Sequence, residues 1–238
     1  MEKIAFLDLD KTLYDGFLFF EWGNYLRVKK VFSKSKTLRL DATSFFFTLL
    51  RDLKIISYLR ASQYVSNEIG KILKGHDISK VLNPTYDFID SVKGNFYDYA
   101  KPLVARLKND GFKVVFVTNE PDFMAEVIKN YLAGDDALGL DIKVKDGVFT
   151  GKIVNDLSTR FGKAKTVKEY AERNDVYLQE CIALGDSEGD IEMLKEVGRG
   201  LLLVDGGTSN SVKTLSMQEN IQTSERNLEE IVNKLGIN

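Results

Sequence analysis

The chain of 238 residues has one cysteine, one histidine and no long apolar run, and each shortage excludes a class of protein. The single Cys181 excludes an internal disulfide and is typical of a reducing compartment. The longest aromatic runs, 17–20 and 45–47, are far shorter than the roughly 20 apolar residues that span a bilayer. The N-terminus has no basic region followed by an apolar stretch, so we expect no signal peptide and a cytoplasmic location.

The chain also lacks an excess of charge of either sign. Its 33 basic and 35 acidic residues give a formal net charge of -2, which offers no basic field to nucleic acid or an anionic membrane. We therefore expect neither as a partner. A composition of 44% apolar and 29% charged residues is typical of a folded protein, and the length allows one domain or two. Whether the chain is a monomer or a homodimer is open.

Two carboxylates follow directly after an apolar run near the N-terminus. The run Ile4–Leu7 predicts a strand buried on both faces, and Asp8 and Asp10 follow it. Burying an unpaired carboxylate is costly, so we expect the pair at the carboxyl edge of a sheet, where open α/β folds bind ligands. There it could hold a divalent cation, and one aspartate could be a nucleophile. The alternative is an acidic loop or a helix N-cap.

From residue 16 to residue 92 the pattern becomes helical. Apolar residues recur there at helical spacing, as in Phe19, Trp22 and Leu26, and again in Leu49, Leu50 and Leu53. We predict that 16–92 is an all-helical module inserted after the first strand. Its aromatic residues most simply form its own core. A sharper hypothesis is that Phe17, Phe20 and Trp22 line an apolar substrate pocket.

The rest of the chain alternates strands with helices. We predict helices over 99–109, 122–132, 162–174 and 191–196, strands over 113–117, 180–184 and 200–204, and a hairpin over 142–149. The tail from residue 206 is polar and then helical. This alternation predicts an α/β fold with a Rossmann-like parallel sheet, built from residues 1–15 and 93–238.

Polar residues follow three of the predicted strands. They are Asp8 with Asp10, Thr118, and Asp186 with Asp190. In a doubly wound sheet these ends meet at one crevice, where four carboxylates repel one another unless a cation such as Mg²⁺ neutralises them. The Thr118 hydroxyl and a lysine, Lys163 or Lys165, would suit a phosphate dianion beside that cation.

Four segments together resemble the motifs of a known family. Residues 8–13 (DLDKTL), Thr118 after its strand, Lys163 and residues 185–190 (GDSEGD) resemble the four motifs of the haloacid dehalogenase superfamily. The spacing of Lys163 to Asp186 and the helical insert resemble its phosphoserine-phosphatase-like branch, which has a helical cap. The resemblance covers the predicted core.

This resemblance implies a phosphoric monoester hydrolase that acts on a small phosphorylated metabolite. Asp8 would attack phosphorus and form an aspartyl-phosphate. Asp10 would protonate the leaving oxygen and later activate water. The same intermediate would serve a phosphotransferase, and a non-catalytic protein that binds a phosphorylated ligand could keep the fold.

The resemblance also implies which residues bind. Asp8, the backbone carbonyl of Asp10 and Asp186 would hold Mg²⁺, with Asp190 as a further or adjacent group. The phosphoryl oxygens would be held by Thr118, Asn119 and Lys163.

Some of these residues have simpler interpretations. Thr118 could cap the next helix, Asp190 could cap the helix from residue 191, and Lys165 could take the place of Lys163, which motif spacing favours. No histidine lies near Ser187 or Cys181 in the sequence, which argues against a serine or cysteine nucleophile.

Two departures from the family pattern concern the substrate. Phosphoserine phosphatases carry a glutamate, which binds the substrate amine, at the position of Phe17, and commonly an asparagine at the position of Gly189. Phe17 offers only a cation–π contact to an ammonium group. We therefore expect a phosphomonoester other than phosphoserine, with an apolar part facing Phe17, Phe20 or Trp22.

Overall fold

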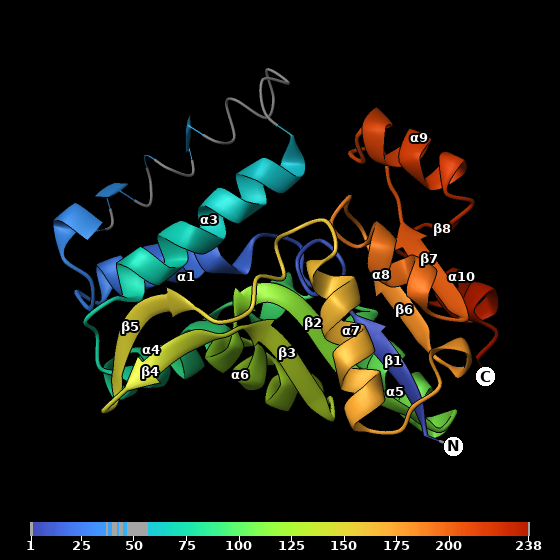
Figure 1. The fold of residues 1–238 in the computed structure, drawn as a ribbon, viewed down its shortest axis with the longest axis horizontal. Helices are drawn as coiled ribbons and strands as arrows, with labels where there is room; N and C mark the ends of the chain where they lie inside the picture. The colour runs from blue at the N-terminus through green and yellow to red at the C-terminus, as the bar shows by residue number, and fades with distance from the viewer. Residues whose placement is uncertain (1, 37, 40–41, 43–44, 47–56, 238) are drawn as a thin grey trace.

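A computed structural model describes residues 2–36, 38–39, 42, 45–46 and 57–237. Its centre is a six-stranded sheet in the order β3-β2-β1-β6-β7-β8, in which every neighbouring pair is parallel (Figure 1). The strands are β1 (Lys3–Leu7), β2 (Phe112–Pro121), β3 (Asp136–Leu140), β6 (Ile182–Gly185), β7 (Arg199–Leu203) and β8 (Gln222–Ser224). The predicted α/β fold with a parallel sheet is confirmed.

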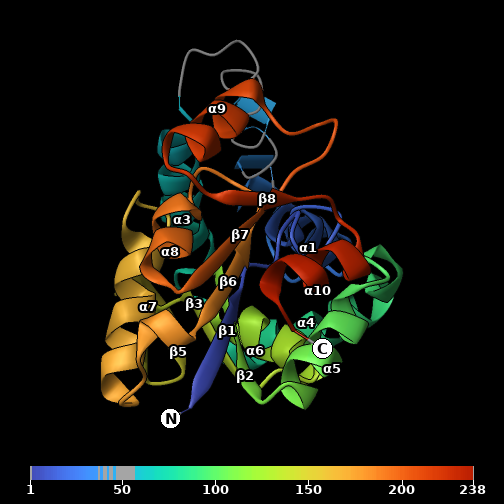
Figure 2. The ribbon, with the colours of Figure 1, turned by 90° about the vertical axis from the view of Figure 1, so that its right-hand side faces the viewer.

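Alternate residues of each central strand face opposite layers of helices. Ile4 and Phe6 of β1 pack in one apolar cluster, and Ala5 and Leu7 pack in the other. Helices α7 (Gly162–Arg173) and α8 (Ile191–Glu196) cover the first face. Helices α5 (Ala100–Asn109), α6 (Asp122–Leu132) and α10 (Leu228–Leu235) cover the second (Figure 2). Because both faces are covered, the strands read as continuous apolar runs rather than alternating ones.

The described part of 16–92 contains helices and no strand. They include α1 (Leu18–Val28), α3 (Tyr58–Leu73) and α4 (Ile78–Ser91), followed by a 3₁₀ turn, η1 (Lys93–Asn95). Ser57 and Asp77 cap α3 and α4 with their side chains. The predicted stripe of Leu49, Leu50 and Leu53 lies outside the described residues. The boundaries at 16 and 92 stay a prediction.

The chain leaves and re-enters the core at adjacent points. Asp15 N donates to Asn95 O over 2.8 Å, and Tyr97 N donates to Leu13 O over 3.0 Å. This pairing places the start of α1 directly beside the loop that follows β1.

A hairpin of the core packs against the helical insert. Strands β4 (Ile142–Lys145) and β5 (Val148–Ile153) flank the predicted Asp146-Gly147 turn, and both turn residues have positive φ. Helix α3 lies so close to β5 that a Cβ on Gly70 would be 2.6 Å from Gly151 O. Backbone contact at this point needs glycine in both segments, at Gly70 and at Gly151.

The strands β3 and β8 were not predicted. The sequence of β3, DALGL, contains aspartate and glycine, which disfavour strands, and β8 has only three residues. In the predicted tail, α9 (Asn210–Gln218) precedes β8, and a short 3₁₀ turn, η2 (Leu178–Glu180), precedes β6. Within the described ranges, none of the helices has the length and apolar character to cross a membrane.

Candidate active site

Asp8 lies at the end of β1 in a tight turn. The carbonyl of Leu9 accepts backbone hydrogen bonds from Thr12, Leu13 and Tyr14, and Lys11 has a left-handed φ of 57°. This turn brings the buried Thr12 hydroxyl back to Asp8, where Oγ1 donates to Oδ2 over 2.9 Å. Only 4% of Asp8 is exposed, so this hydrogen bond fixes the orientation of a carboxylate with little access to water.

Lys163 connects two of the aspartates. Its Nζ donates to Asp8 Oδ1 over 2.5 Å and to Asp190 Oδ1 over 2.6 Å, and the residue is 3% exposed. Lys165 is on a different side of α7, with a side chain 75% exposed and 3.7 Å from Glu169. The structure therefore brings Lys163, and not Lys165, to the aspartates.

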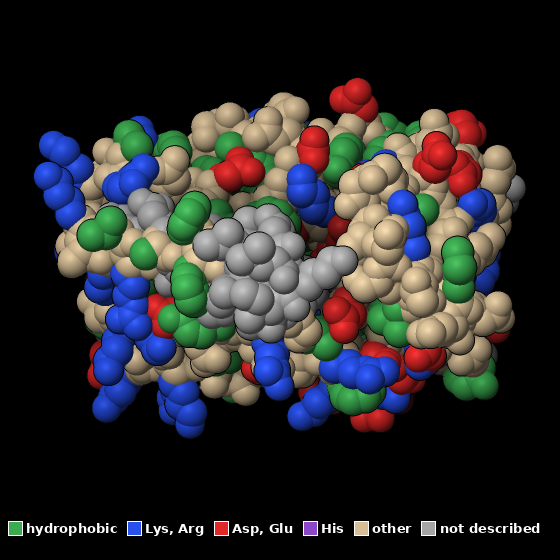
Figure 3. All heavy atoms as spheres, turned by 90° about the horizontal axis from the view of Figure 1, so that it is seen from above, with side chains coloured by type: hydrophobic (Ala, Val, Ile, Leu, Met, Phe, Trp, Pro, Cys, Tyr) green, Lys and Arg blue, Asp and Glu red, His purple; other side chains and the backbone are tan. Residues whose placement is uncertain are grey.

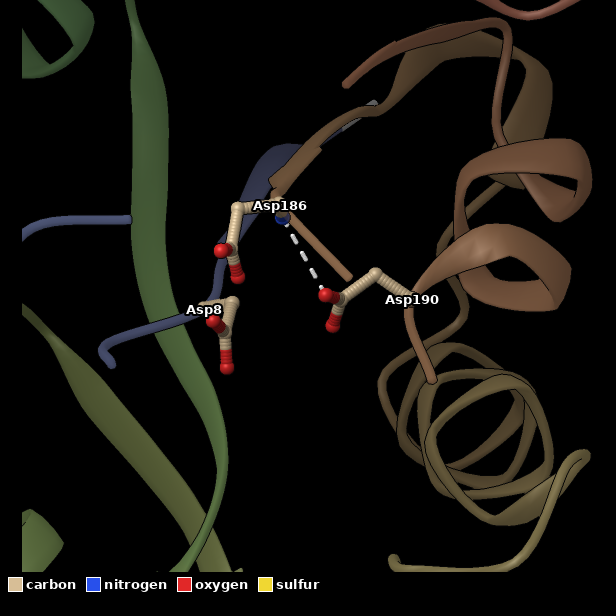
Figure 4. A group of neighbouring side chains, drawn as sticks. All are labelled: Asp8, Asp186 and Asp190. Atoms are coloured by element: carbon tan, nitrogen blue, oxygen red, sulfur yellow. Dashed lines mark hydrogen bonds between the residues drawn. The ribbon is translucent and has the colours of Figure 1, made fainter. Parts of the chain in front are cut away.

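Asp190 organises the loop after β6. Its Oδ2 accepts from the backbone N–H of Asp186 over 3.2 Å (Figure 4). The same oxygen accepts from the N–H and the hydroxyl of Ser187, over 2.9 and 2.6 Å. It does not cap α8. A Cβ on Gly185 would lie 2.5 Å from Asp190 Cβ, so glycine at this position lets the carboxylate fold back over the loop. Asp190 is buried with both oxygens occupied.

Thr118 and Asn119 come from the end of β2, beside β1. Thr118 is 1% exposed, and its Oγ1 accepts from Glu120 N over 3.2 Å. Helix α6 begins at Asp122 without a side-chain cap, so Thr118 does not cap it. Asn119 Nδ2 donates to Ser62 Oγ of α3 over 3.3 Å, which links the end of β2 to the helical insert.

These side chains surround one small cavity at the carboxyl edge of the sheet. It measures about 80 Å³ and is lined by Asp8, Asp10, Lys11, Phe17, Thr118, Asn119, Lys163, Asp186 and Ser187. Figure 3 looks down on this edge and shows acidic side chains at the bottom of a hollow. The cavity is thus bordered by the ends of β1, β2 and β6 and by the start of α7. Open α/β sheets bind ligands at this place, outside the carboxyl ends of adjacent strands.

The three aromatic residues that were predicted to line a substrate pocket differ in their position relative to the cavity. Phe17 lines the cavity and is 38% exposed. Phe20 packs edge-on against Phe17 but is not part of the cavity wall. Trp22 requires a correction: it is fully buried, its indole N–H donates to Thr85 Oγ1 over 2.9 Å, and its ring packs against Phe123. It belongs to the core between α1, α4 and α6.

The model of the haloacid dehalogenase-like hydrolases matches residues 5–195, most of the chain. The chain belongs to this family. Phosphoserine phosphatase SerB1 of Mycobacterium tuberculosis is 25% identical over 207 residues, which cover 84% of the chain and 64% of that protein. Phosphoserine phosphatase of Archaeoglobus fulgidus is 30% identical over 131 residues, covering 55% and 36%. The chain therefore spans less than two thirds of the length of either relative.

Solved structures share the fold. A Bordetella pertussis protein of unknown function has a TM-score of 0.76 at 18% identity, over 94% of this chain and 99% of that one. A phospho-aspartyl intermediate analogue of phosphoserine phosphatase has a TM-score of 0.64 at 22% identity, over 98% of both chains. The predicted resemblance to the phosphoserine-phosphatase-like branch of the family is confirmed.

The aspartates of this site fit a hard divalent cation. One oxygen from each of Asp8, Asp186 and Asp190 lies within 4.8 Å of the others (Figure 4). Carboxylate oxygens are the ligands that Mg²⁺ prefers. The Asp10 side chain is not part of this group. Its Oδ1 instead accepts a hydrogen bond from Leu18 N over 3.0 Å. Its backbone carbonyl is the group that the family resemblance assigns to the metal.

Burial and mutual repulsion disturb the charge states of these groups. Burial raises the pKa of Asp8 to about 7, against the opposing effect of Lys163, and burial raises the pKa of Asp10 to about 6. The pKa of Asp186 is also raised, by burial and by Asp8. For Lys163, burial acts to lower the pKa, but Asp190 and Asp8 outweigh it and raise it. A second cation would relieve the same repulsion.

Sequence reasoning missed three residues of this site. Thr12 stands inside the recognised motif, but its bond to Asp8 was not foreseen. Glu120 follows the predicted strand, and its Oε1 accepts from Phe19 N at the start of α1. Arg226 donates to Lys11 O over 2.7 Å and lies 3.4 Å from Asp186 Oδ2. Nothing in the sequence around Arg226 indicates a contact with residues this distant.

Proposed function

We propose that the chain is a Mg²⁺-dependent phosphatase that hydrolyses small phosphomonoesters through a phosphorylated Asp8. The observation that carries the proposal is the position of Lys163, whose ammonium group lies 2.5 Å from the carboxylate at the bottom of the cavity. A buried cation beside a buried carboxylate favours the ionised form of that carboxylate against the effect of burial, and it stabilises phosphoryl oxygens that approach it.

The chain's own residues supply the steps. An oxygen of Asp8 forms a bond to phosphorus while the ester P–O bond breaks, and Asp10 gives its proton to the departing alcohol. Asp10 then takes a proton from a water that attacks phosphorus, which releases phosphate and restores Asp8. Thr118 and Lys163 hold the phosphoryl oxygens, with Asn119 beside them.

Mg²⁺ would be held by Asp8, the carbonyl of Asp10 and Asp186, with Asp190 adjacent. Bound there, it would neutralise the carboxylates and polarise the phosphoryl group. Since Asp190 already binds Lys163 and the loop after β6, we assign it to positioning these groups.

The cavity wall supports a small phosphomonoester without a required amine. Outside Lys163 and the aspartates assigned to catalysis and metal, the wall consists of Phe17, Lys11 and uncharged groups. Lys11 Nζ lies 5.7 Å from the Phe17 ring, so a substrate ammonium would meet a cation at this wall. The relatives are named phosphoserine phosphatases, and phosphoserine is therefore the competitor to test. A cytoplasmic location is part of this proposal.

The test is hydrolysis of a panel of phosphomonoesters, including phosphoserine, with Mg²⁺ and with EDTA. Asp8→Asn should lower turnover at least about 1,000-fold, because it removes the nucleophile at nearly constant shape. Asp98→Asn, at an exposed carboxylate, is the matched control and should leave turnover unchanged. Equal turnover by the wild type and Asp8→Asn would refute the proposal. A new phosphoester after addition of an acceptor alcohol would indicate a phosphotransferase instead.

The substrate assignment has its own test. Phe17→Glu should raise kcat/KM for phosphoserine relative to glycerol phosphate, because it places a carboxylate on the cavity wall. If the wild type already prefers phosphoserine and Phe17→Glu does not increase that preference, Phe17 does not select against the amine.

A further inference from the structure

Glu120 is a buried carboxyl group that the proposed mechanism does not use. It lies in β2 two residues after Thr118, is 3% exposed and does not line the cavity. One oxygen, Oε1, accepts from Phe19 N over 3.0 Å. The other, Oε2, is one of the two buried side-chain oxygens of the described residues that have no hydrogen-bond donor. A burial this costly needs a reason.

The bond to Phe19 is one of a pair at the start of α1. Leu18 N donates to Asp10 Oδ1, and the next amide, Phe19 N, donates to Glu120 Oε1, both over 3.0 Å. The N-cap residue Phe17 offers no side-chain cap of its own. The first turn of α1 is therefore capped by two carboxyl groups of the core, one of which is the proposed acid/base.

The two carboxyl groups therefore bind neighbouring amides of one helical turn. Because Leu18 and Phe19 are consecutive, the bond from Phe19 N to Glu120 fixes where the Leu18 N–H lies. Asp10 is thus held by the Leu18 amide, and Glu120 holds the turn that carries this amide. Phe17, directly before these amides, forms part of the cavity wall.

We propose that Glu120 is the positioning residue for Asp10: it ties the first turn of α1 to β2 and so fixes the acid/base carboxyl against the leaving-group side of the cavity. The inference rests on the proposed phosphatase function. It assigns to Glu120 no contact with substrate. Its effect is exerted through Asp10, and should appear wherever the departing alcohol needs a proton.

Glu120→Met tests this with little change in volume. Replacing a buried carboxyl by an apolar side chain of similar shape is commonly tolerated, so the variant should fold. Glu120→Gln keeps an acceptor for Phe19 N. Glu21→Gln is the matched control, because it removes a carboxylate from α1 that bonds to Tyr14 and not to the helix amides.

The first readout is amide hydrogen exchange of a peptide covering 16–22. Glu120→Met should exchange roughly 10- to 100-fold faster at Leu18 and Phe19, the factor expected when a buried amide loses its hydrogen-bond acceptor. Glu120→Gln and Glu21→Gln should match the wild type. Unchanged exchange in Glu120→Met would overturn the proposal, whether or not the protein is active.

The second readout compares an aryl phosphate, whose leaving group needs no proton, with an alkyl phosphate, whose leaving group does. In Glu120→Met, kcat for the alkyl ester should fall roughly tenfold or more relative to the aryl ester, with Glu120→Gln close to the wild type. An equal loss on both esters would overturn the positioning role. If the wild type hydrolyses neither ester, the proposed function fails, and exchange alone decides whether Glu120 holds α1.

Discussion

Replacing Lys163 by methionine should destabilise the metal-free protein strongly. The ammonium group lies 2.5 Å from Asp8 and 2.6 Å from Asp190, and Coulomb's law at an effective dielectric constant of roughly 20 gives about 6.5 kcal/mol for each contact. Desolvation of the three buried groups cancels much of this sum. Removing one partner, however, leaves the two carboxylates buried without it, and such losses amount to about 3–5 kcal/mol.

The assay is chemical unfolding in EDTA at pH 8, followed by circular dichroism, for the wild type, Lys163→Met and Lys165→Met. Lys165 is the matched control, because its exposed contact with Glu169 is worth at most about 1 kcal/mol. Mg²⁺ should restore part of the stability of Lys163→Met, since it neutralises the same carboxylates. If the two variants are equally stable in EDTA, Lys163 has no net role in holding Asp8 and Asp190, and the electrostatic reasoning fails.

Three further predictions follow from the same contacts. The metal-free protein should become less stable as the pH rises from 5.5 to 8. The pKa values of Asp8 (about 7) and Asp10 (about 6) are raised in the folded state, so the folded state binds more protons than the unfolded state in this range. Thermal unfolding in EDTA should show this fall of stability with pH, and the fall should be smaller in Asp8→Asn. Gly185→Ala should lower the free energy of unfolding by about 1–3 kcal/mol and lower turnover, because its Cβ would meet Asp190. Chemical unfolding and kinetics test this, and an active, fully stable variant would contradict the packing. Trp22→Ala should cost about 3–5 kcal/mol of unfolding free energy while the ranking of substrates stays the same; a changed ranking would return Trp22 to the substrate pocket.

Apolar runs and their spacing were enough to predict most of the sheet. The run Ile4–Leu7 and the segment 113–117 proved to be adjacent parallel strands, and the Asp146-Gly147 turn stands where its residue types predict. The predictions failed for β3 and β8, edge strands whose residues have little intrinsic strand preference. Their pairing with β2 and β7 comes from the sheet itself, through backbone hydrogen bonds that any residue other than proline can make.

By itself, the sequence determined which chemistry is available: the aspartates after the first and third apolar strands, the threonine after the second, and one lysine at a motif spacing. These are local patterns, and residue types and their spacing along the chain are enough to recognise them. Only the tertiary structure decided which groups touch. It placed Lys163 between Asp8 and Asp190, buried Trp22 away from the cavity, and brought Glu120 to Phe19 across 101 positions and Arg226 to Lys11 across 215. Such contacts depend on the order of the strands in the sheet and on how the helices pack, and neither can be deduced from spacing along the sequence.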